Sequence, residues 1–155
     1  MDNPFMSRAI ELSLENARSG RGGPFGAVIV RERRILAEGA NQVTTSSDPT
    51  AHAEVIAIRK ACQELGHFEL SGCELYTSCE PCPMCLGAIY WARISRVYFA
   101  NVAADAAKIG FSDAAIYSEI AKPYPQRAIP MTQMMREEAL AAFRAWEANP
   151  NKIDY

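Results

Sequence analysis

The sequence of 155 residues contains no apolar run that approaches the ~20 residues of a membrane-spanning helix. Its first residues, Met1 to Phe5, lack the positively charged segment and the following apolar stretch of a secretory signal. We therefore expect a cytoplasmic protein that has no membrane partner.

An excess of positive charge is also missing, because 16 Lys and Arg face 18 Asp and Glu and the formal net charge is -2. The one tight basic cluster consists of Arg31, Arg33 and Arg34. Proteins that bind a nucleic-acid backbone usually carry a broad basic surface. The charge balance therefore favours a small-molecule substrate, and we expect no nucleic-acid partner.

Cysteine is present in an odd number, five, and three of the five crowd into one short segment as Cys79, Cys82 and Cys85. In a reducing compartment such crowding indicates metal binding rather than disulfides. We interpret Cys62 and Cys73 as small buried hydrophobic residues. Since 49% of the residues are hydrophobic, the chain can bury a core without a metal to hold it together.

The spacing of apolar residues predicts one α/β domain over residues 1–155, with a central sheet covered by helices on both faces. Gly20 and Gly66 mark the ends of two predicted helices, and Asn149-Pro150 ends the last one. The predicted helices span residues 4–18, 50–65, 81–92, 113–121 and 136–148. The predicted strands span residues 27–31, 35–39, 74–78, 96–100 and 130–135.

Two short motifs carry the chemistry, His52-Ala53-Glu54 and Pro81-Cys82-Pro83-Met84-Cys85. Together they match the H-x-E…P-C-x-x-C signature of zinc-dependent deaminases. Two thiolates and one imidazole can hold zinc and leave the fourth position to water, whose pKa zinc lowers to about 7. We therefore predict one zinc ion per chain, bound by His52, Cys82 and Cys85, with Glu54 as the catalytic proton carrier.

The spacing of the motifs also predicts where they lie on helices. Cys82 and Cys85 are three residues apart and share one helix face. Pro81 suits the first helical position, so both thiols are expected near a helix N-terminus, which favours thiolates. His52 and Glu54 both fit into a first turn if Thr50 is the N-cap. Two helix N-termini are thus predicted to converge on one zinc ion.

A structural zinc site is the alternative to a catalytic one. Cys79 and Cys82 have the same spacing as Cys82 and Cys85, so spacing alone permits Cys79 as a fourth ligand. A site of this kind would leave Glu54 without a role and would make the protein a zinc-stabilised interaction module.

Longer strings extend the pattern beyond the two motifs. They are residues 22–30, 48–54, 75–93, 110–113, 116–117 and 154–155. These strings resemble bacterial guanine deaminases of the cytidine-deaminase superfamily. The central strings are shared with tRNA adenosine deaminases and cytosine deaminases, so the guanine assignment depends on the chain after Asn101 and on its C-terminus.

The resemblance implies a three-layer α/β/α fold with a mixed sheet of about five strands. It implies zinc-dependent hydrolysis of guanine to xanthine and ammonia, a step of purine catabolism or salvage. It further implies a homodimer in which the C-terminal tail, residues 149–155, is exchanged between subunits. The alternative substrates are other heterocycles, namely adenine or tRNA adenosine, cytosine and aminotriazines.

The resemblance also assigns the contacts to the purine base. Phe25, Asn41, Asp113 and Tyr155 are expected to bind it, and Trp91 to form a wall of the pocket. These residue types suit a flat purine, which stacks on aromatic rings and bonds through its ring N–H groups to carboxylate or amide acceptors. Ordinary structural roles remain open: a core residue for Phe25, a turn residue for Asn41, a helix cap for Asp113 and a frayed terminus for Tyr155.

Overall fold

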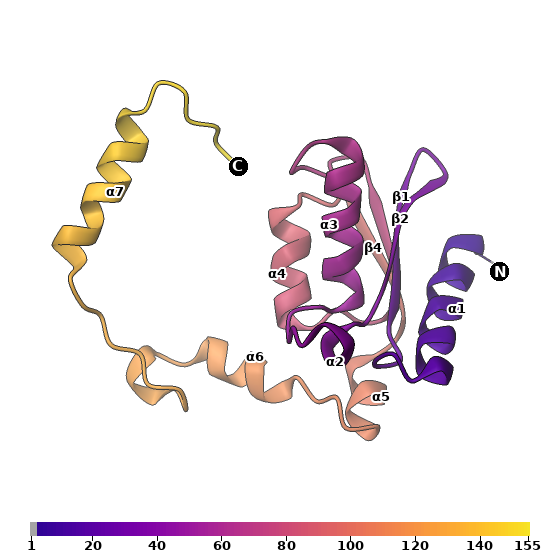
Figure 1. Ribbon diagram of the computed structural model, residues 1–155. Helices are drawn as coiled ribbons and strands as arrows, with labels where there is room; N and C mark the ends of the chain where they lie inside the picture. Colours follow the sequence, from indigo (N-terminus) through magenta and orange to yellow (C-terminus); the bar gives the residue numbers. More distant parts are fainter. Residues whose placement is uncertain (1–2) are drawn as a thin grey trace. The chain divides into compact units, whose positions relative to one another are not determined.

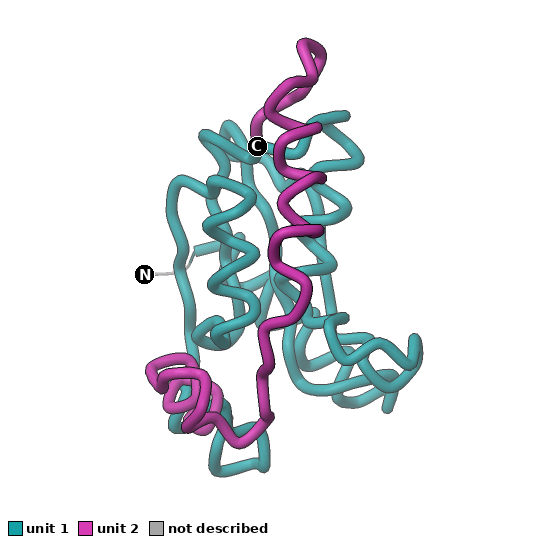
Figure 2. The backbone as a smooth tube through the Cα atoms, turned by 90° about the vertical axis from the view of Figure 1, so that its left-hand side faces the viewer, with its two compact units in different colours: residues 1–113 teal, residues 114–155 magenta. Residues whose placement is uncertain are grey.

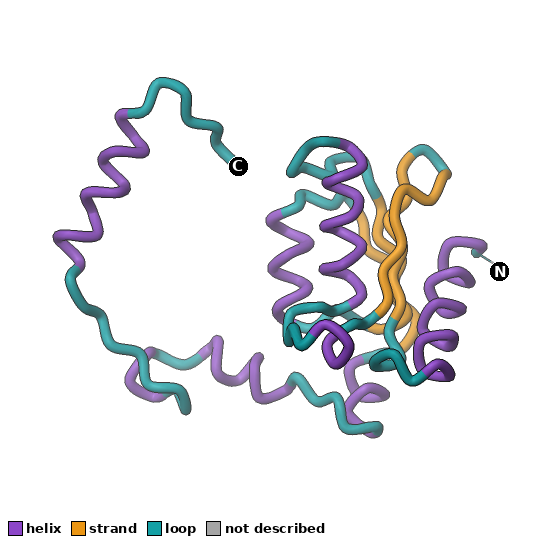
Figure 3. Tube along the Cα trace, in the orientation of Figure 1, coloured by secondary structure: helices purple, strands orange, loops and turns teal. Residues whose placement is uncertain are grey.

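The computed structural model describes residues 3–155, so Met1 and Asp2, the first two residues of the expected domain, lie outside the described residues. The chain divides into two compact units, which we call unit 1 (residues 1–113) and unit 2 (residues 114–155) (Figure 2). Unit 1 contains a sheet between helices, whereas unit 2 contains helices and irregular segments (Figure 3).

The sheet of unit 1 has four strands in the order β2-β1-β3-β4. β1 (Gly26–Arg31) pairs antiparallel with β2 (Arg34–Ala40) and with β3 (Glu74–Cys79). β4 (Arg96–Asn101) pairs parallel with β3, so the sheet is mixed, as expected. The first four predicted strands are therefore confirmed.

The fifth strand, predicted over residues 130–135, does not form anywhere in the described chain, and that part of the prediction is wrong. The segment is irregular from Pro130 to Met135. Proline has no N–H to donate to a strand ladder, and the helices of unit 2 offer no strand with which the segment could pair. A single strand would leave its backbone groups unpaired, so a strand-like composition is not sufficient here.

Helices cover both faces of the sheet, which confirms the predicted three layers. α1 (Pro4–Ser19) packs against one face. α3 (Ala53–Leu65) and α4 (Pro83–Trp91) lie on the other face (Figure 1). This second face carries both helices at whose N-terminal ends the predicted ligands lie.

Alternate side chains of β1 fill a core on each face of the sheet. Val28 and Val30 pack with residues of α1, while Ala27 and Ile29 pack with residues of α3. All four are at most 2% exposed. Complete burial of one Val or Ile side chain contributes ~1.5–3 kcal/mol, so β1 is the strand on which both cores depend.

Gly39 of β2 allows the start of α3 to lie directly on the sheet. A Cβ atom at this position would come within 2.2 Å of the Ala53 carbonyl oxygen and 2.8 Å of the Ala57 backbone nitrogen. Any larger residue would push the first turn of α3 outward. The place of His52, which directly precedes that turn, therefore depends on the absence of a side chain at Gly39.

The predicted helix ends are largely confirmed, while three short helices were not predicted. α1 ends at Gly20 and α3 at Gly66, with φ of 67° and 62° in the left-handed region that glycine adopts readily. Helices of three to six residues are too short to produce a recognisable apolar period. The unpredicted ones are α2 (Val43–Ser46), α5 (Ala103–Lys108) and η1 (Tyr124–Gln126).

Unit 2 contains two of the predicted helices, α6 (Ala114–Ala121) and α7 (Arg136–Ala148), and α7 ends at Asn149 as expected. Neither helix contains a buried residue, and large apolar side chains such as Phe143 and Trp146 are exposed. No helix within residues 3–155 combines the length and the apolar character needed to cross a membrane.

Candidate metal centre and active site

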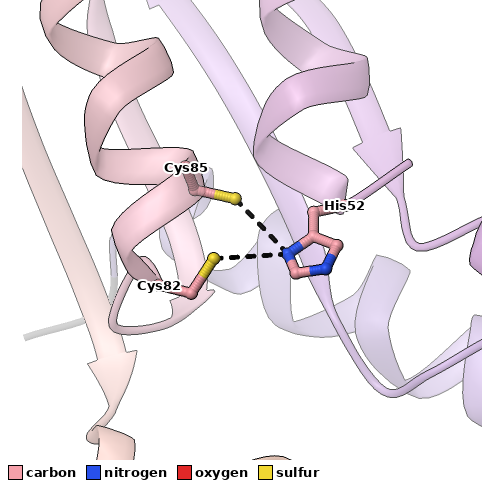
Figure 4. A group of neighbouring side chains, drawn as sticks. All are labelled: His52, Cys82 and Cys85. Carbon is pink, nitrogen blue, oxygen red and sulfur yellow. Dashed lines mark hydrogen bonds between the residues drawn. The ribbon is translucent and has the colours of Figure 1, made fainter. Parts of the chain in front are cut away.

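Three side chains that are far apart in the sequence meet at one end of α3 and α4. The ligand atoms of His52, Cys82 and Cys85 all lie within 4.8 Å of one another. His52 Nδ1 is 3.5 Å from the sulfur of Cys82 and 3.5 Å from that of Cys85 (Figure 4). Two sulfurs and one imidazole nitrogen are a donor set that suits zinc and leaves its fourth tetrahedral position open.

Two of these three residues are themselves the N-caps of their helices. His52 precedes α3 and Cys82 precedes α4, both with extended backbone angles and neither with a side-chain capping bond. Their side chains are therefore available to a metal ion, while the free N–H groups of each first turn point the positive end of a helix dipole at it.

The predicted helix starts were wrong by two or three residues, although the convergence of the two N-termini was right. Thr50 is not an N-cap, because its N–H and hydroxyl both bond to Asp48 Oδ1, at 2.8 and 2.7 Å, in a turn before the helix. Pro81 lies outside α4, and Pro83 occupies the first helical position. Either proline suits the first helical position by sequence, so only the tertiary structure distinguishes Pro83 from Pro81.

The electrostatics of the ligand group favour a thiolate even without an ion. A hydrogen bond from the Cys85 thiol, together with His52 and the local backbone, lowers the pKa of Cys82 to about 4. The pKa of Cys85 is shifted in the opposite direction, because its bond to Cys82 and its burial raise it. Binding of a divalent cation would require both sulfurs as thiolates and would release any proton that they hold.

The carboxylate of Glu54 lies beside the ligands without belonging to the ligand group. Its Oε2 is 3.4 Å from Cys85 Sγ, and its Oε1 accepts a hydrogen bond from Thr77 Oγ1 at 2.8 Å. Burial raises the pKa of Glu54 above its ordinary value, although the hydrogen bonds act in the opposite direction. A raised pKa favours uptake of a proton by this carboxyl, as a group that carries protons requires.

Cys79, the alternative fourth ligand, points elsewhere. Its sulfur lies 3.9 Å from the Val102 carbonyl oxygen, and it is not a member of the group formed by His52, Cys82 and Cys85. Burial raises the pKa of Cys79 to about 11, so its thiol stays protonated. This geometry favours an open, catalytic site over a structural Cys₃His site.

The side-chain amide of Asn41 has only one orientation that satisfies its neighbours. Its Oδ1 accepts hydrogen bonds from the backbone N–H groups of Gly23 and Val43, at 3.3 and 3.2 Å. Because those groups can only donate, the amide nitrogen of Asn41 has to face the other way. Within residues 3–155 this nitrogen has no hydrogen-bond partner, so it is free to donate to a ligand.

Asn16, which the sequence analysis did not single out, holds this region in place. It is 3% exposed on α1, and its Nδ2 donates to the carbonyl oxygens of Gly23 and Asn41, both at 2.8 Å. Asn41 in turn donates its backbone N–H to Phe25 O at 3.1 Å. Asparagine is a poor helix former, so its presence inside α1 was a usable sign of such a role.

Phe25 lies against a second aromatic residue that the sequence analysis did not assign. Its ring meets that of Phe111 edge to face, with the centroids 5.0 Å apart. Phe25 also borders a cavity of about 320 Å³ between α1 and α5. None of the three candidate metal ligands, nor Glu54, lines that cavity, so it is not the candidate metal site.

The other predicted contacts lie in different parts of the chain. Asp113 is half-buried directly before α6, at the end of unit 1. Trp91 ends α4, which its nine residues make about 13 Å long, so it lies at the far end of that helix from Cys82. Tyr155 belongs to unit 2, where its ring lies 6.5 Å from that of Trp146. The roles of Trp91 and Tyr155 stay predictions.

Known proteins are similar to this chain in sequence and fold. Residues 1–101 match the sequence model of the cytidine and deoxycytidylate deaminase zinc-binding region. The chain therefore belongs to the family of zinc-dependent cytidine and deoxycytidylate deaminases. The guanine deaminase of Bacillus subtilis (strain 168) is 58% identical over 151 residues, 97% of each chain. By that similarity the chain belongs with the guanine deaminases of this family.

Solved structures agree with the sequence comparison. The X-ray structure of the guanine deaminase from Bacillus subtilis matches all of this chain and 99% of that one, with a TM-score of 0.96 and 56% identity. A structure of NE0047 in complex with 2,6-diaminopurine covers 97% of this chain and 83% of that one, with a TM-score of 0.67 and 32% identity.

A more distant relative is similar over a shorter part of the chain. The tRNA-specific adenosine deaminase of Agrobacterium fabrum is 45% identical over 93 residues, which are 58% of this chain and 61% of that one. The similarity to this tRNA deaminase thus covers a smaller share of the chain than the similarity to the guanine deaminase. The expectation that the chain after Asn101 distinguishes the two kinds of enzyme stays a prediction.

Proposed function

We infer that this protein catalyses the hydrolytic deamination of guanine to xanthine and ammonia, with one zinc ion per chain. The observation that carries this inference is the convergence of His52, Cys82 and Cys85 next to the buried carboxylate of Glu54. The choice of guanine is supported by the similarity to a guanine deaminase over 97% of the chain. A purine base as substrate also fits the diaminopurine complex of the structural relative.

When bound, zinc supplies Lewis-acid activation of a water molecule at neutral pH. Glu54 takes a proton from the water that adds to C2 of guanine and delivers it to a ring nitrogen. It then carries the hydroxyl proton to the exocyclic amine, after which the C2–N bond breaks and ammonia leaves. The N–H groups in the first turn of α4 face the developing negative charge and stabilise it.

The base is recognised by groups of complementary chemistry. Asn41 donates its amide N–H to an acceptor on the base, since its oxygen is already occupied by two backbone N–H groups. Phe25, supported by Phe111, provides an aromatic face for stacking. Asp113 accepts a hydrogen bond from a ring N–H group, which neither of the other two can do.

The decisive test is a screen for ammonia release from free bases and nucleosides by the zinc-loaded protein. Guanine is expected to be the best substrate, ahead of adenine, cytosine, aminotriazines and adenosine in tRNA. Faster release from any of these would assign the site to another heterocycle. If no compound released ammonia although zinc is bound, the protein would be a zinc-stabilised interaction module rather than an enzyme.

An Asp113→Ala variant tests the recognition of the base within the same screen. Leaving a ring N–H unpaired in a closed site costs ~1–3 kcal/mol, so kcat/KM for guanine should fall by about 10- to 100-fold. Zinc content should not change, because Asp113 is not among the ligands. An unaltered kcat/KM would show that Asp113 does not contact the base and only precedes α6 in the chain.

We further propose that residues 1–155 act as one catalytic domain in a homodimer whose subunits exchange the tail, residues 149–155. The support lies in unit 2, where α6 and α7 contain no buried residue and expose Phe143 and Trp146. Exchange requires no new kind of contact, because the same surfaces meet between chains rather than within one. In such a dimer Tyr155 would close an active site, and Trp91 would form part of its wall.

Deletion of residues 151–155 tests the role of the tail. The shortened protein should still bind zinc and should lose kcat/KM for guanine, because the site would remain open to water. Light scattering on both proteins reports the oligomeric state, and the full-length chain should be a dimer. A truncated enzyme with full activity, or a full-length monomer that is fully active, would contradict the proposal.

We also place the enzyme in the cytoplasm. All five cysteines are free thiols, and the proposed chemistry needs two of them reduced. A reducing compartment keeps thiols in this form.

A further inference from the structure

One buried polar side chain next to the active site has no part in the chemistry described so far. Thr77 lies on β3 and is 0% exposed. Its hydroxyl donates a hydrogen bond of 2.8 Å to Oε1 of Glu54, which is 23 residues away in the sequence. Burying a hydroxyl is unfavourable unless it is hydrogen-bonded, so this bond gives Thr77 its only polar role among the described residues.

We propose that Thr77 is a positioning residue that holds Glu54 in its proton-carrying orientation. The inference rests on the role of Glu54 given under the proposed function. The two carboxylate oxygens of Glu54 are chemically equivalent, but their surroundings are not. Oε1 is occupied by Thr77, whereas Oε2 lies 3.4 Å from the sulfur of Cys85 and therefore faces the metal ligands. The bond thus reserves Oε2 for the reacting atoms.

The bond from Thr77 can persist in both protonation states of Glu54. An ionised carboxylate only accepts hydrogen bonds, so the threonine hydroxyl has to be the donor. When the carboxyl takes up a proton on Oε2, Oε1 still accepts the same bond. Thr77 therefore opposes rotation of the carboxyl group, which would carry the proton away from the substrate.

Thr77 is also held more rigidly than a surface residue could be. β3 lies between two strands, and Thr77 pairs with Ala27 of β1 on one side and with Phe99 of β4 on the other. Branching at Cβ restricts the side chain to few rotamers. The same strand leads directly into the segment that carries Cys82. β3 thus fixes the position of Glu54 through Thr77 and that of Cys82 through the connected chain.

A matched pair of variants separates positioning from packing. Thr77→Val keeps the shape of the side chain and removes the hydroxyl, while Thr77→Ser keeps the hydroxyl and removes a methyl group. For a positioning role, kcat for guanine should fall by about 10- to 100-fold in Thr77→Val, the order of loss that misplaced catalytic groups cause. KM should change by less than about twofold, because ground-state binding is untouched. Thr77→Ser should keep most of the activity.

A packing role predicts the opposite order, with Thr77→Ser the more damaging change because a buried methyl group is lost. That order, or equal activity of the two variants, would overturn the inference. Zinc content and the melting temperature are measured for both. If Thr77→Val does not fold, Thr77→Ala replaces it as the variant without a hydroxyl, and the same comparison with Thr77→Ser applies.

The combination with Glu54→Gln distinguishes failure of this inference from failure of the proposed mechanism. If Thr77 acts through Glu54, the double variant should be no slower than Glu54→Gln alone. A further loss of about tenfold in the double variant would mean that Thr77 acts by another route. An active Glu54→Gln enzyme would instead contradict the proposed mechanism, whatever the activity of Thr77→Val.

Discussion

Replacement of Glu54 by Gln is expected to reduce kcat for guanine by about 100- to 10,000-fold, the range that a positioned general acid–base group contributes. The amide has nearly the same shape and can still accept the bond from Thr77, so fold and zinc content should remain. It cannot take a proton from water or pass one to the departing amine. Ammonia release under saturating guanine, with metal analysis on the same sample, measures both quantities.

Glu64→Gln is the matched control for this change. Glu64 lies on the same helix, α3, but is exposed near the other end of that helix. The substitution Glu64→Gln therefore removes one negative charge without touching the metal centre. Its activity should equal that of the unchanged enzyme. A Glu54→Gln enzyme with near-normal kcat would show that another group carries the protons.

The second large effect is expected from loss of a metal ligand. Cys85→Ser should hold almost no zinc and show no turnover, because the hydroxyl is a far weaker zinc ligand than the thiolate. Removal of zinc from the unchanged protein by a chelator should abolish activity, and added zinc should restore it. Metal analysis should find about one zinc per chain before removal.

Cys79→Ser is the control that decides between catalytic and structural zinc. Its sulfur faces the Val102 carbonyl oxygen rather than the ligand group, so zinc and most of the activity should remain. Loss of zinc from Cys79→Ser would establish a fourth protein ligand and contradict the open site. Retention of full activity by Cys85→Ser would contradict the ligand assignment.

The group of candidate metal ligands was predictable from the sequence because ligands on helix N-termini follow short spacings. The three-residue step from Cys82 to Cys85 and the pairing of His52 with Glu54 are local, and they survive any small shift of the helix boundary. The ends of α1 and α3 were predictable for the same reason, since Gly20 and Gly66 adopt left-handed angles that other residues avoid.

Contacts between distant segments were not predictable in this way. Nothing in the sequence identifies Glu54 as the partner of the Thr77 hydroxyl, or the backbone of Gly23 and Asn41 as the partner of Asn16. These contacts depend on how α1, α3 and β3 pack. The donor role of the Asn41 amide was not predictable either. That role follows because two backbone N–H groups donate to the Asn41 side-chain oxygen, and only the folded chain brings them there.

The sequence by itself determined the four strands and the three longer helices of unit 1, the zinc ligands to be tested and the carboxylate beside them, since each depends on periodicity or spacing within one segment. The tertiary structure decided that His52 and Cys82 are N-caps, because either nearby start was sterically acceptable and packing selected one. It also decided that the sheet has four strands. A strand exists only where a neighbour accepts its hydrogen bonds, and residues 130–135 have none.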